Sequence, residues 1–332
     1  MAMPRRWLKS SNFSKIIQID MTQIKFIFLL FAIIFVGATY AFSQSNVTAD
    51  EKTVVYLKKH RSDYIQSMVN KKPEMMQSYY AENIRLMPEF QKTVIGKANA
   101  LSYHKAFSDR FDIKSYSRNE LEVLDLGERI VELGMFTMKM ISKNTNKEYE
   151  IKGKYQNIWE KLTNNNISLV TEAWNYNHAL EIEDQLRFDE VPEVNIALQA
   201  HVPINSKISF ELAALNRLME ATIMQHDAKI WSQFYSNDGM FLYSRHPVYK
   251  GRKALDEFLE KHVKEDMPIF EKLDIRNDQI DDLGDYVIEY ASHIANWRRG
   301  EYSGINTGKD IRIWRRGVDC SLKIFRAMGM YD

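Results

Sequence analysis

Two parallel phrases constrain the fold of this chain more than any other feature of its sequence. Gly153–Trp159 reads GKYQNIW, and Gly308–Trp314 reads GKDIRIW, 155 residues further on (308 minus 153). The same offset of 155 residues relates Tyr80 to Tyr235. An offset of this length is far above the roughly 20–50 residues of a solenoid repeat, and it matches the size of a whole domain. We therefore predict two tandem copies of one domain.

The N-terminal segment has the parts of an export signal. Basic residues from Arg5 to Lys25 precede an uncharged apolar run, Phe26–Phe42, and small residues follow at the spacing that signal peptidase recognises, before Gln44. These parts predict a signal peptide at residues 1–43, starting at Met1 or Met21, and a periplasmic or secreted mature protein. The apolar run of 17 residues is near the lower limit of roughly 17–25 residues for a membrane span, so an uncleaved N-terminal anchor is the alternative.

The composition excludes several classes of partner and cofactor. The chain has 45 basic and 44 acidic residues, a formal charge of +1, so we expect no nucleic-acid partner. The sequence has no H-E-x-x-H, P-loop or dinucleotide motif, so we expect no metal and no cofactor. The single cysteine, Cys320, has no partner for an internal disulfide. We expect it in the last strand as a small buried apolar side chain.

Hydrophobic periodicity predicts both helices and strands in each copy. Apolar residues three or four apart indicate helices, and alternating segments rich in β-branched and aromatic residues indicate strands. In the first copy, 50–178, we predict helices at 50–70, 73–80 and 97–108, and strands at 84–87, 94–95, 114–126, 128–142, 147–161 and 166–178. In the second copy, 208–332, we predict helices at 208–225, 227–235 and 252–263, and strands at 240–243, 248–250, 269–281, 285–298, 305–316 and 320–328.

The segment between the copies, 179–207, begins with many acidic residues and contains Pro192 and Pro203. We interpret it as an inter-domain linker with a short helix in its middle. Helices followed by runs of antiparallel strands indicate the α+β class. A long strand series with one apolar face has to curl over the helices to bury that face. The expected shape of each domain is a cone with an opening at one end.

Each copy resembles the nuclear transport factor 2-like superfamily, which includes ketosteroid isomerases and SnoaL-like cyclases. The segments that carry the resemblance are Tyr79–Asn83, Ile95–Ala98 and Gly153–Trp159 in the first copy, and His226–Ala228, Tyr235–Gly239, Tyr249–Leu255, Gly308–Arg316 and Leu322–Ile324 in the second. The resemblance implies two cone-shaped cystatin-like or SnoaL-like domains with helices packed on a curved antiparallel sheet. It does not select a function, because such folds host isomerases, dehydratases, cyclases, hydrolases and binding modules.

The catalytic pattern of the ketosteroid isomerases does not carry over to this chain. Their carboxylate base falls on Tyr243 in the second copy and on Pro88 in the first, and neither residue is a carboxylate. Their oxyanion-donating tyrosine is matched by Tyr64 in the first copy and by Met219 in the second. A steroid isomerase is therefore not expected, although the resemblance keeps Tyr64 as a candidate for ligand binding.

The strand predicted at 285–298 carries the strongest candidate chemistry. Glu289, His293 and Trp297 share one face of it because alternate residues of a strand point the same way. Glu289 and His293 are about 13 Å apart along the strand, so they can line one cavity at different depths. With Arg312 from the next strand and Tyr243, they form a candidate set for general acid–base catalysis. The competing interpretation is that Glu289 and His293 face solvent or make structural hydrogen bonds.

Further candidates for ligand contact lie outside this set. His246 is in a loop near the expected mouth of the second cone, and Trp297 is towards one end of the strand face. The matching face of the first copy keeps a glutamate, Glu132, but has Phe136 in place of the histidine. That cavity is expected to be more apolar.

We therefore predict an exported protein that binds a small molecule in a partly apolar pocket of the second domain. One alternative is a cofactor-independent lyase, isomerase or hydrolase that uses Tyr243, Glu289 and His293, with Arg312 stabilising an anion. The other is a non-catalytic scaffold with filled cavities. The expected partner is a small-molecule ligand, without membrane contact after leader cleavage, and the copies are expected to pair as an internal pseudo-dimer or the chain as a homodimer.

Overall fold

The computed structural model describes residues 48–163, 166–199, 201–265 and 267–332. The predicted signal peptide lies outside these residues. The remainder contains two six-stranded sheets with the same strand order, β2-β1-β6-β5-β4-β3 and β8-β7-β12-β11-β10-β9. Helices accompany each sheet, so the predicted α+β class with two tandem domains is confirmed.

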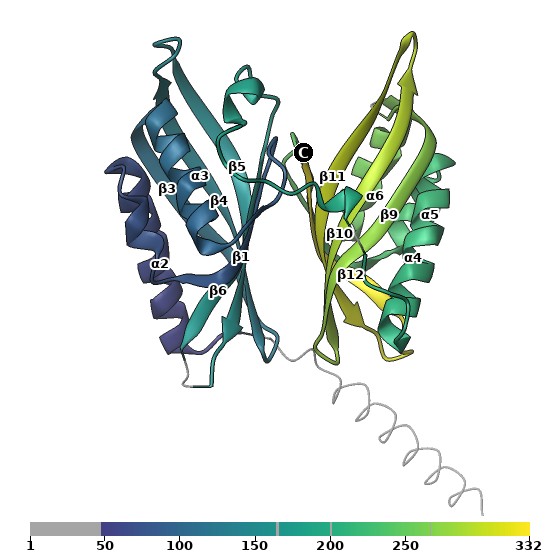
Figure 1. Ribbon diagram of the computed structural model, residues 1–332. Helices are drawn as coiled ribbons and strands as arrows, with labels where there is room; N and C mark the ends of the chain where they lie inside the picture. Colours follow the sequence, from purple (N-terminus) through teal and green to yellow (C-terminus); the bar gives the residue numbers. More distant parts are fainter. Residues whose placement is uncertain (1–47, 164–165, 200, 266) are drawn as a thin grey trace, which may run out of the picture. The chain divides into compact units, whose positions relative to one another are not determined.

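The first repeat contains two α-helices, one short 3-10 helix and six strands. Their bounds are α2 Glu51–Val69, η1 Pro73–Met76, β1 Tyr80–Pro88, β2 Val94–Ile95, α3 Lys97–Arg110, β3 Phe111–Asp125, β4 Arg129–Ser142, β5 Glu148–Lys161 and β6 Ile167–Tyr176. Figure 1 shows α2 and α3 on one side of this sheet. The apolar core of the repeat contains side chains of both helices and of the sheet, including Tyr64, Phe107 and Trp159.

The second repeat follows the same order. Its elements are α4 Lys207–Met224, α5 Ala228–Gln233, β7 Tyr235–Leu242, β8 Val248–Lys250, α6 Arg252–Glu265, β9 Ile269–Asp282, β10 Tyr286–Arg299, β11 Tyr302–Arg316 and β12 Leu322–Tyr331. Gly96 before α3 and Gly251 before α6 have φ values of 95° and 82°. Glycine adopts such positive values without strain, which explains why both repeats carry it at this turn.

One strand pair in each sheet differs from the expected antiparallel pattern. β1 is parallel to β6, and β7 is parallel to β12. The three hairpin turns of β3–β6 bring the last strand back beside β1 in the same direction, and β9–β12 do the same beside β7. The sheets are therefore mixed.

Cys320 differs from the expectation as well. It is exposed, in the turn between β11 and β12, with a φ of 63°. The last strand begins only at Leu322. Cys320 precedes it, in the turn from Gly317 to Ser321, and is not part of the strand. The prediction of a buried thiol is wrong.

The segment 179–207 contains two 3-10 turns, η2 Glu183–Leu186 and η3 Ile196–Leu198. Part of it packs on the first repeat, because Ile182, Leu186 and Phe188 are buried in that core. The chain between β6 and α4 therefore adds side chains to the apolar core of the first repeat.

A third apolar cluster contains side chains from both sheets, and the described residues form one compact unit. Val131 and Leu133 of β4 belong to this shared cluster, whereas Ile130 and Met138 of the same strand belong to the helix-side core of the first repeat. Because alternate strand residues point to opposite faces, each sheet buries one face under its own helices and the other against the second sheet.

Two buried lysines make reciprocal contacts between the repeats. Nζ of Lys154 on β5 donates to the carbonyl oxygen of His246 in the second repeat at 2.6 Å. Nζ of Lys309 on β11 donates to the carbonyl oxygen of Gln91 in the first repeat at 2.5 Å. Both pairs, Lys154 with Lys309 and Gln91 with His246, are 155 residues apart, so each repeat donates to the same place in the other. We call these the reciprocal lysine contacts.

Candidate functional site

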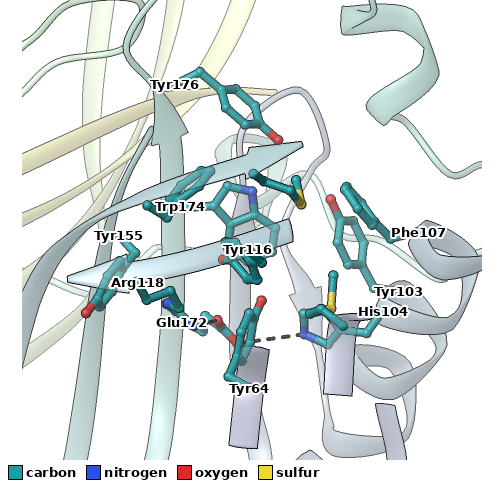
Figure 2. A pocket seen from close by; sticks show the side chains of 13 residues that line it. Tyr64, Tyr103, His104, Phe107, Tyr116, Arg118, Tyr155, Glu172, Trp174 and Tyr176 are labelled. Atoms are coloured by element: carbon teal, nitrogen blue, oxygen red, sulfur yellow. Dashed lines mark hydrogen bonds and ion pairs between the residues drawn. The ribbon is translucent and has the colours of Figure 1, made fainter. Parts of the chain in front are cut away.

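A cavity of about 30 Å³ lies within the first repeat. Its lining is mostly aromatic and comes from α2, α3 and the helix-facing side of the sheet (Figure 2). Tyr64, Tyr116, Phe136, Tyr155, Trp174 and Tyr176 line it. A water molecule needs roughly 10–15 Å³ of such volume, so the cavity as it stands has room for two or three waters.

Four polar side chains from four elements meet beside this cavity. Tyr80 on β1 donates its hydroxyl to Oε2 of Glu172 on β6 at 3.0 Å, and Nε2 of His104 on α3 lies 2.9 Å from the same hydroxyl. Nη1 of Arg118 on β3 lies 3.3 Å from Oε1 of Glu172 (Figure 2). Their side chains are buried. We call Tyr80, His104, Arg118 and Glu172 the polar group of the first repeat.

The charges of Arg118 and Glu172 compensate each other. Burial raises the pKa of Glu172, but the interaction with His104 and the charge of Arg118 outweigh burial and lower this pKa to about 2. The carboxylate is therefore ionised at neutral pH. The guanidinium of Arg118 also lies 4.1 Å from the ring centre of Tyr64 and 3.9 Å from that of Tyr155, which stabilises a cation in an aromatic environment.

These hydrogen bonds determine the tautomer of His104. An ionised Glu172 only accepts, so the hydroxyl proton of Tyr80 points to the carboxylate. The oxygen of Tyr80 then accepts from His104, which places a proton on Nε2. In a neutral imidazole the other nitrogen, Nδ1, is left as an acceptor.

Three polar atoms on the cavity-lining residues have no hydrogen-bond partner among the described residues. They are Oη of Tyr103, Nδ1 of His104 and Nε of Arg118. A buried polar atom without a partner costs about 1–3 kcal/mol. These three fully buried atoms therefore leave one hydroxyl, one acceptor and one donor without a partner.

The second repeat keeps a tyrosine, Tyr235, at the position of Tyr80 and carries apolar residues at the other three positions of this polar group. The offset is 155 residues in the helices and in β5 and β6, and 157 in β3 and β4, since Phe136 lies opposite Gly153 and His293 lies opposite Gly308. Leu259, Ile275 and Ala327 are then the counterparts of His104, Arg118 and Glu172. All three counterparts are buried.

The predicted catalytic residues Glu289 and Arg312 lie in contact. Both carboxylate oxygens of Glu289 are occupied: Asn216 Nδ2 donates at 2.8 Å, Trp314 Nε1 at 2.8 Å and Arg312 Nη1 at 3.4 Å. The glutamate is fully buried. This arrangement is that of a buried, hydrogen-bonded ion pair in the core of the second repeat.

His293 is connected to this ion pair through Asp310. Its Nδ1 lies 3.2 Å from Oδ2 of Asp310, and Nη2 of Arg312 donates to the same oxygen at 3.2 Å. Glu289, Arg312, Asp310 and His293 thus form one continuous chain of contacts.

Tyr243 and His246 belong to a different cluster of the second repeat. The hydroxyl of Tyr243 lies 3.0 Å from that of Tyr331, and the ring of His246 lies 5.3 Å from the ring of Tyr243. Tyr249 and Phe258 stack beside them at 4.1 Å. Aromatic side chains therefore fill this part of the second repeat.

The remaining candidates lie in three different places. Trp297 is near the far end of β10, where its ring lies over Gly304. Glu132 on β4 is fully buried and accepts from Arg61, Tyr155 and Asn157. Of the eight residues selected from the sequence, Tyr64 alone lines the cavity.

The polar group of the first repeat was missed because each member looks ordinary in its own segment. Glu172 sits in an apolar strand, Arg118 in an alternating strand and His104 in a helix. The signal was available in the comparison of the repeats, since all three replace apolar residues of the second repeat. An ionisable residue at a core position needs a partner, so three such replacements predict a cluster.

Comparisons with known proteins give matches among solved structures. No family model and no curated protein matches the chain. Similar solved structures include a ketosteroid isomerase-like protein from Erwinia carotovora atroseptica (13% identity, TM-score 0.33, covering 39% of this chain and 98% of that one). Others are a nuclear transport factor 2-like superfamily protein from Salmonella enterica (9%, 0.33, 39% and 96%) and ActVI-ORFA from Streptomyces coelicolor (13%, 0.33, 38% and 98%).

At 9–13% identity, the likeness to these structures concerns the fold alone. Among the described residues, no group of three or more His, Cys, Asp or Glu side chains is placed to hold a metal ion. In the same part of the chain, no helix is long and apolar enough to cross a membrane.

Proposed function

We propose that the protein binds a small, partly apolar molecule in the cavity of the first repeat. The observation that carries this proposal is the set of three unpartnered polar atoms, on Tyr103, His104 and Arg118, beside an aromatic cavity. Ligand sites combine a mainly apolar lining with a few convergent polar groups. The second repeat, in which the sequence predicted the pocket, has apolar residues at the positions of His104, Arg118 and Glu172.

A ligand larger than two or three waters has to displace part of the lining. Met68 on α2 and Met138 on β4 both line the cavity and are buried. Methionine is unbranched and adapts its conformation more readily than other apolar side chains. We propose that the cavity enlarges for a ligand when these two side chains change conformation.

The test is a thermal-shift screen of the chain from Gln44 onward against a metabolite library. It compares the wild type with His104→Leu, which introduces the residue of the second repeat, and with His293→Leu as the matched control. The proposal expects a stabilising compound whose effect is lost in His104→Leu and kept in His293→Leu. Loss only in His293→Leu would instead place the pocket in the second repeat.

A second candidate function is cofactor-independent acid–base catalysis. The contact chain from Glu172 through Tyr80 to His104 favours it, because it fixes Nδ1 of His104 as a proton acceptor beside the cavity. A lyase, isomerase or hydrolase can use such a base. Turnover of a compound found in the screen, with a rate at least 100-fold lower in His104→Leu, would support catalysis. Binding of the compound without turnover would indicate a binding protein and not an enzyme for that compound.

Export and internal pairing are part of the proposal. The leader-like segment supports export to the periplasm or beyond, and N-terminal sequencing of the protein from its native host tests it. A start at Gln44 is expected, whereas an intact leader in the membrane fraction would indicate an anchor. The shared apolar cluster and the reciprocal lysine contacts support an internal pseudo-dimer.

A further inference from the structure

We propose that the ligand of the first-repeat cavity is an uncharged molecule that carries a hydroxyl group on a flat apolar body. This inference rests on the proposed binding function and specifies the chemical class of the ligand.

The first argument is charge balance. The side chains of Arg118 and Glu172 are 2% and 0% exposed and lie 3.3 Å apart, so the site contains one compensated pair of charges. A charged ligand would add a third charge with no free counter-charge among the lining side chains described. Uncompensated charges in such surroundings cost several kcal/mol. A neutral ligand avoids this cost.

The second argument is the pattern of unmet hydrogen bonds. Nδ1 of His104 needs a donor, Nε of Arg118 needs an acceptor, and Oη of Tyr103 can act as either. A hydroxyl group both donates and accepts, so its chemistry suits the acceptor on His104 as well as the donor on Arg118 and the hydroxyl of Tyr103. An amine cation only donates and a carboxylate only accepts, so neither satisfies the set.

The third argument is the shape of the lining. The rings of Tyr64, Tyr116 and Trp174 line the cavity (Figure 2), and Phe136 is a further lining residue. Aromatic rings pack favourably against other flat rings in offset or edge-to-face arrangements. A planar body therefore gains more contact here than a branched aliphatic one, once Met68 or Met138 is displaced.

Four probes of similar size separate these arguments: phenol, toluene, benzoate and benzylamine. Binding to the full mature chain at pH 7 is measured by titration calorimetry or ligand-observed NMR. Phenol is expected to bind at least tenfold more tightly than each of the others, because toluene lacks the hydroxyl and the last two are charged. In Met138→Ala, which removes part of the lining, phenol is expected to bind more tightly than in the wild type.

A conservative variant locates the hydroxyl. Tyr103→Phe removes only Oη and introduces the residue that the second repeat has at this position, Phe258. The preference for phenol over toluene is expected to fall in this variant and in His104→Leu. Tyr290→Phe, which removes a buried hydroxyl of the second repeat, is the matched control and is expected to keep the preference.

The outcomes are distinct for the two proposals. Benzoate or benzylamine binding as tightly as phenol, or a preference unchanged in both Tyr103→Phe and His104→Leu, overturns the ligand class. Phenol failing to bind both the wild type and Met138→Ala also overturns it. The proposed binding function is tested separately. It is refuted if the metabolite screen yields no compound whose stabilising effect is lost in His104→Leu.

Discussion

His60 is a buried histidine whose counterpart in the second repeat is Leu215. Neither ring nitrogen has a hydrogen-bond partner in the described structure. Burial, together with the charge of Arg118, lowers the pKa of His60 from 6.5 to about 3. The folded protein therefore resists protonation of this ring, whereas the unfolded chain does not.

This difference predicts the pH dependence of His60→Leu. Between pH 6.5 and 3 the unfolded wild type binds a proton that the folded state does not, so His60 makes stability fall as the pH decreases, by up to about 1.4 kcal/mol per pH unit. The leucine variant is expected to lose this contribution. Urea unfolding at pH 7.5 and pH 4.5 measures it, and an equal decrease in both proteins would contradict the assignment.

Lys154 and Lys309 occupy equivalent positions but have different partners. Nζ of Lys309 pairs with the carboxylate of Asp332 at 2.7 Å, whereas Nζ of Lys154 donates to the amide oxygen of Asn177 at 3.0 Å. Burial lowers the pKa of Lys154 from 10.5 to about 7. The charged form of Lys154 is therefore disfavoured in the folded protein.

Asn177→Asp would give Lys154 the partner that Lys309 has. In the wild type the unfolded chain holds a proton between pH 7 and 10.5 that the folded state has lost, so Lys154 makes stability rise with pH across this range. The aspartate should raise the pKa of Lys154, stabilise the protein at pH 7 by about 1–3 kcal/mol and diminish this rise. Unfolding free energies at pH 7 and 9.5 test it, and a less stable variant at pH 7 would refute it.

At the scale of elements, each repeat buries one glutamate at an equivalent position. The two repeats provide its arginine and asparagine donors from opposite elements. Glu132 accepts from Arg61 on α2 and Asn157 on β5. Glu289 accepts from Asn216 on α4 and Arg312 on β11. Arg61 corresponds to Asn216, and Asn157 corresponds to Arg312, each 155 residues apart. Helix and sheet have thus exchanged the arginine and the asparagine around the same carboxylate.

A double-mutant cycle tests this exchange. Arg61→Asn alone leaves Glu132 without its ion-pair partner and should cost roughly 3–5 kcal/mol. Adding Asn157→Arg reproduces the arrangement of the second repeat and should recover at least about half of that loss. Additive effects of the two substitutions, measured by chemical denaturation, would show that the positions are not interchangeable.

Most of the element order could be predicted from the sequence, because the hydrophobic period changes clearly from helix to strand. The parallel pairs β1–β6 and β7–β12 could not, since periodicity does not record which strands become neighbours. The candidate site was harder for the same reason. His104, Arg118 and Glu172 lie up to 68 residues apart in the chain (172 minus 104), and only the sheet order brings their elements together.

At the scale of the whole molecule, the shared apolar cluster predicts a monomer. The face that each sheet could offer to a second copy is buried against the other repeat, with Ile158 and Ile313 among its fully buried residues. Size-exclusion chromatography with light scattering should give the mass of one mature chain. The mass of two chains at micromolar concentration would show that another surface mediates association.

The reciprocal lysine contacts also bear on how a duplicated gene can diverge. Each lysine donates to a carbonyl oxygen of the opposite repeat, and a backbone carbonyl is present whatever side chain stands at that position. Residues as different as Gln91 and His246 can therefore provide the same acceptor. Substitutions at these two positions leave the contacts between the repeats intact. Among the described residues, the helix-side interiors make no contact of this kind across the junction, so each can carry its own set of ionisable groups: His104, Arg118 and Glu172 in the first repeat, and Glu289, Asp310 and Arg312 in the second.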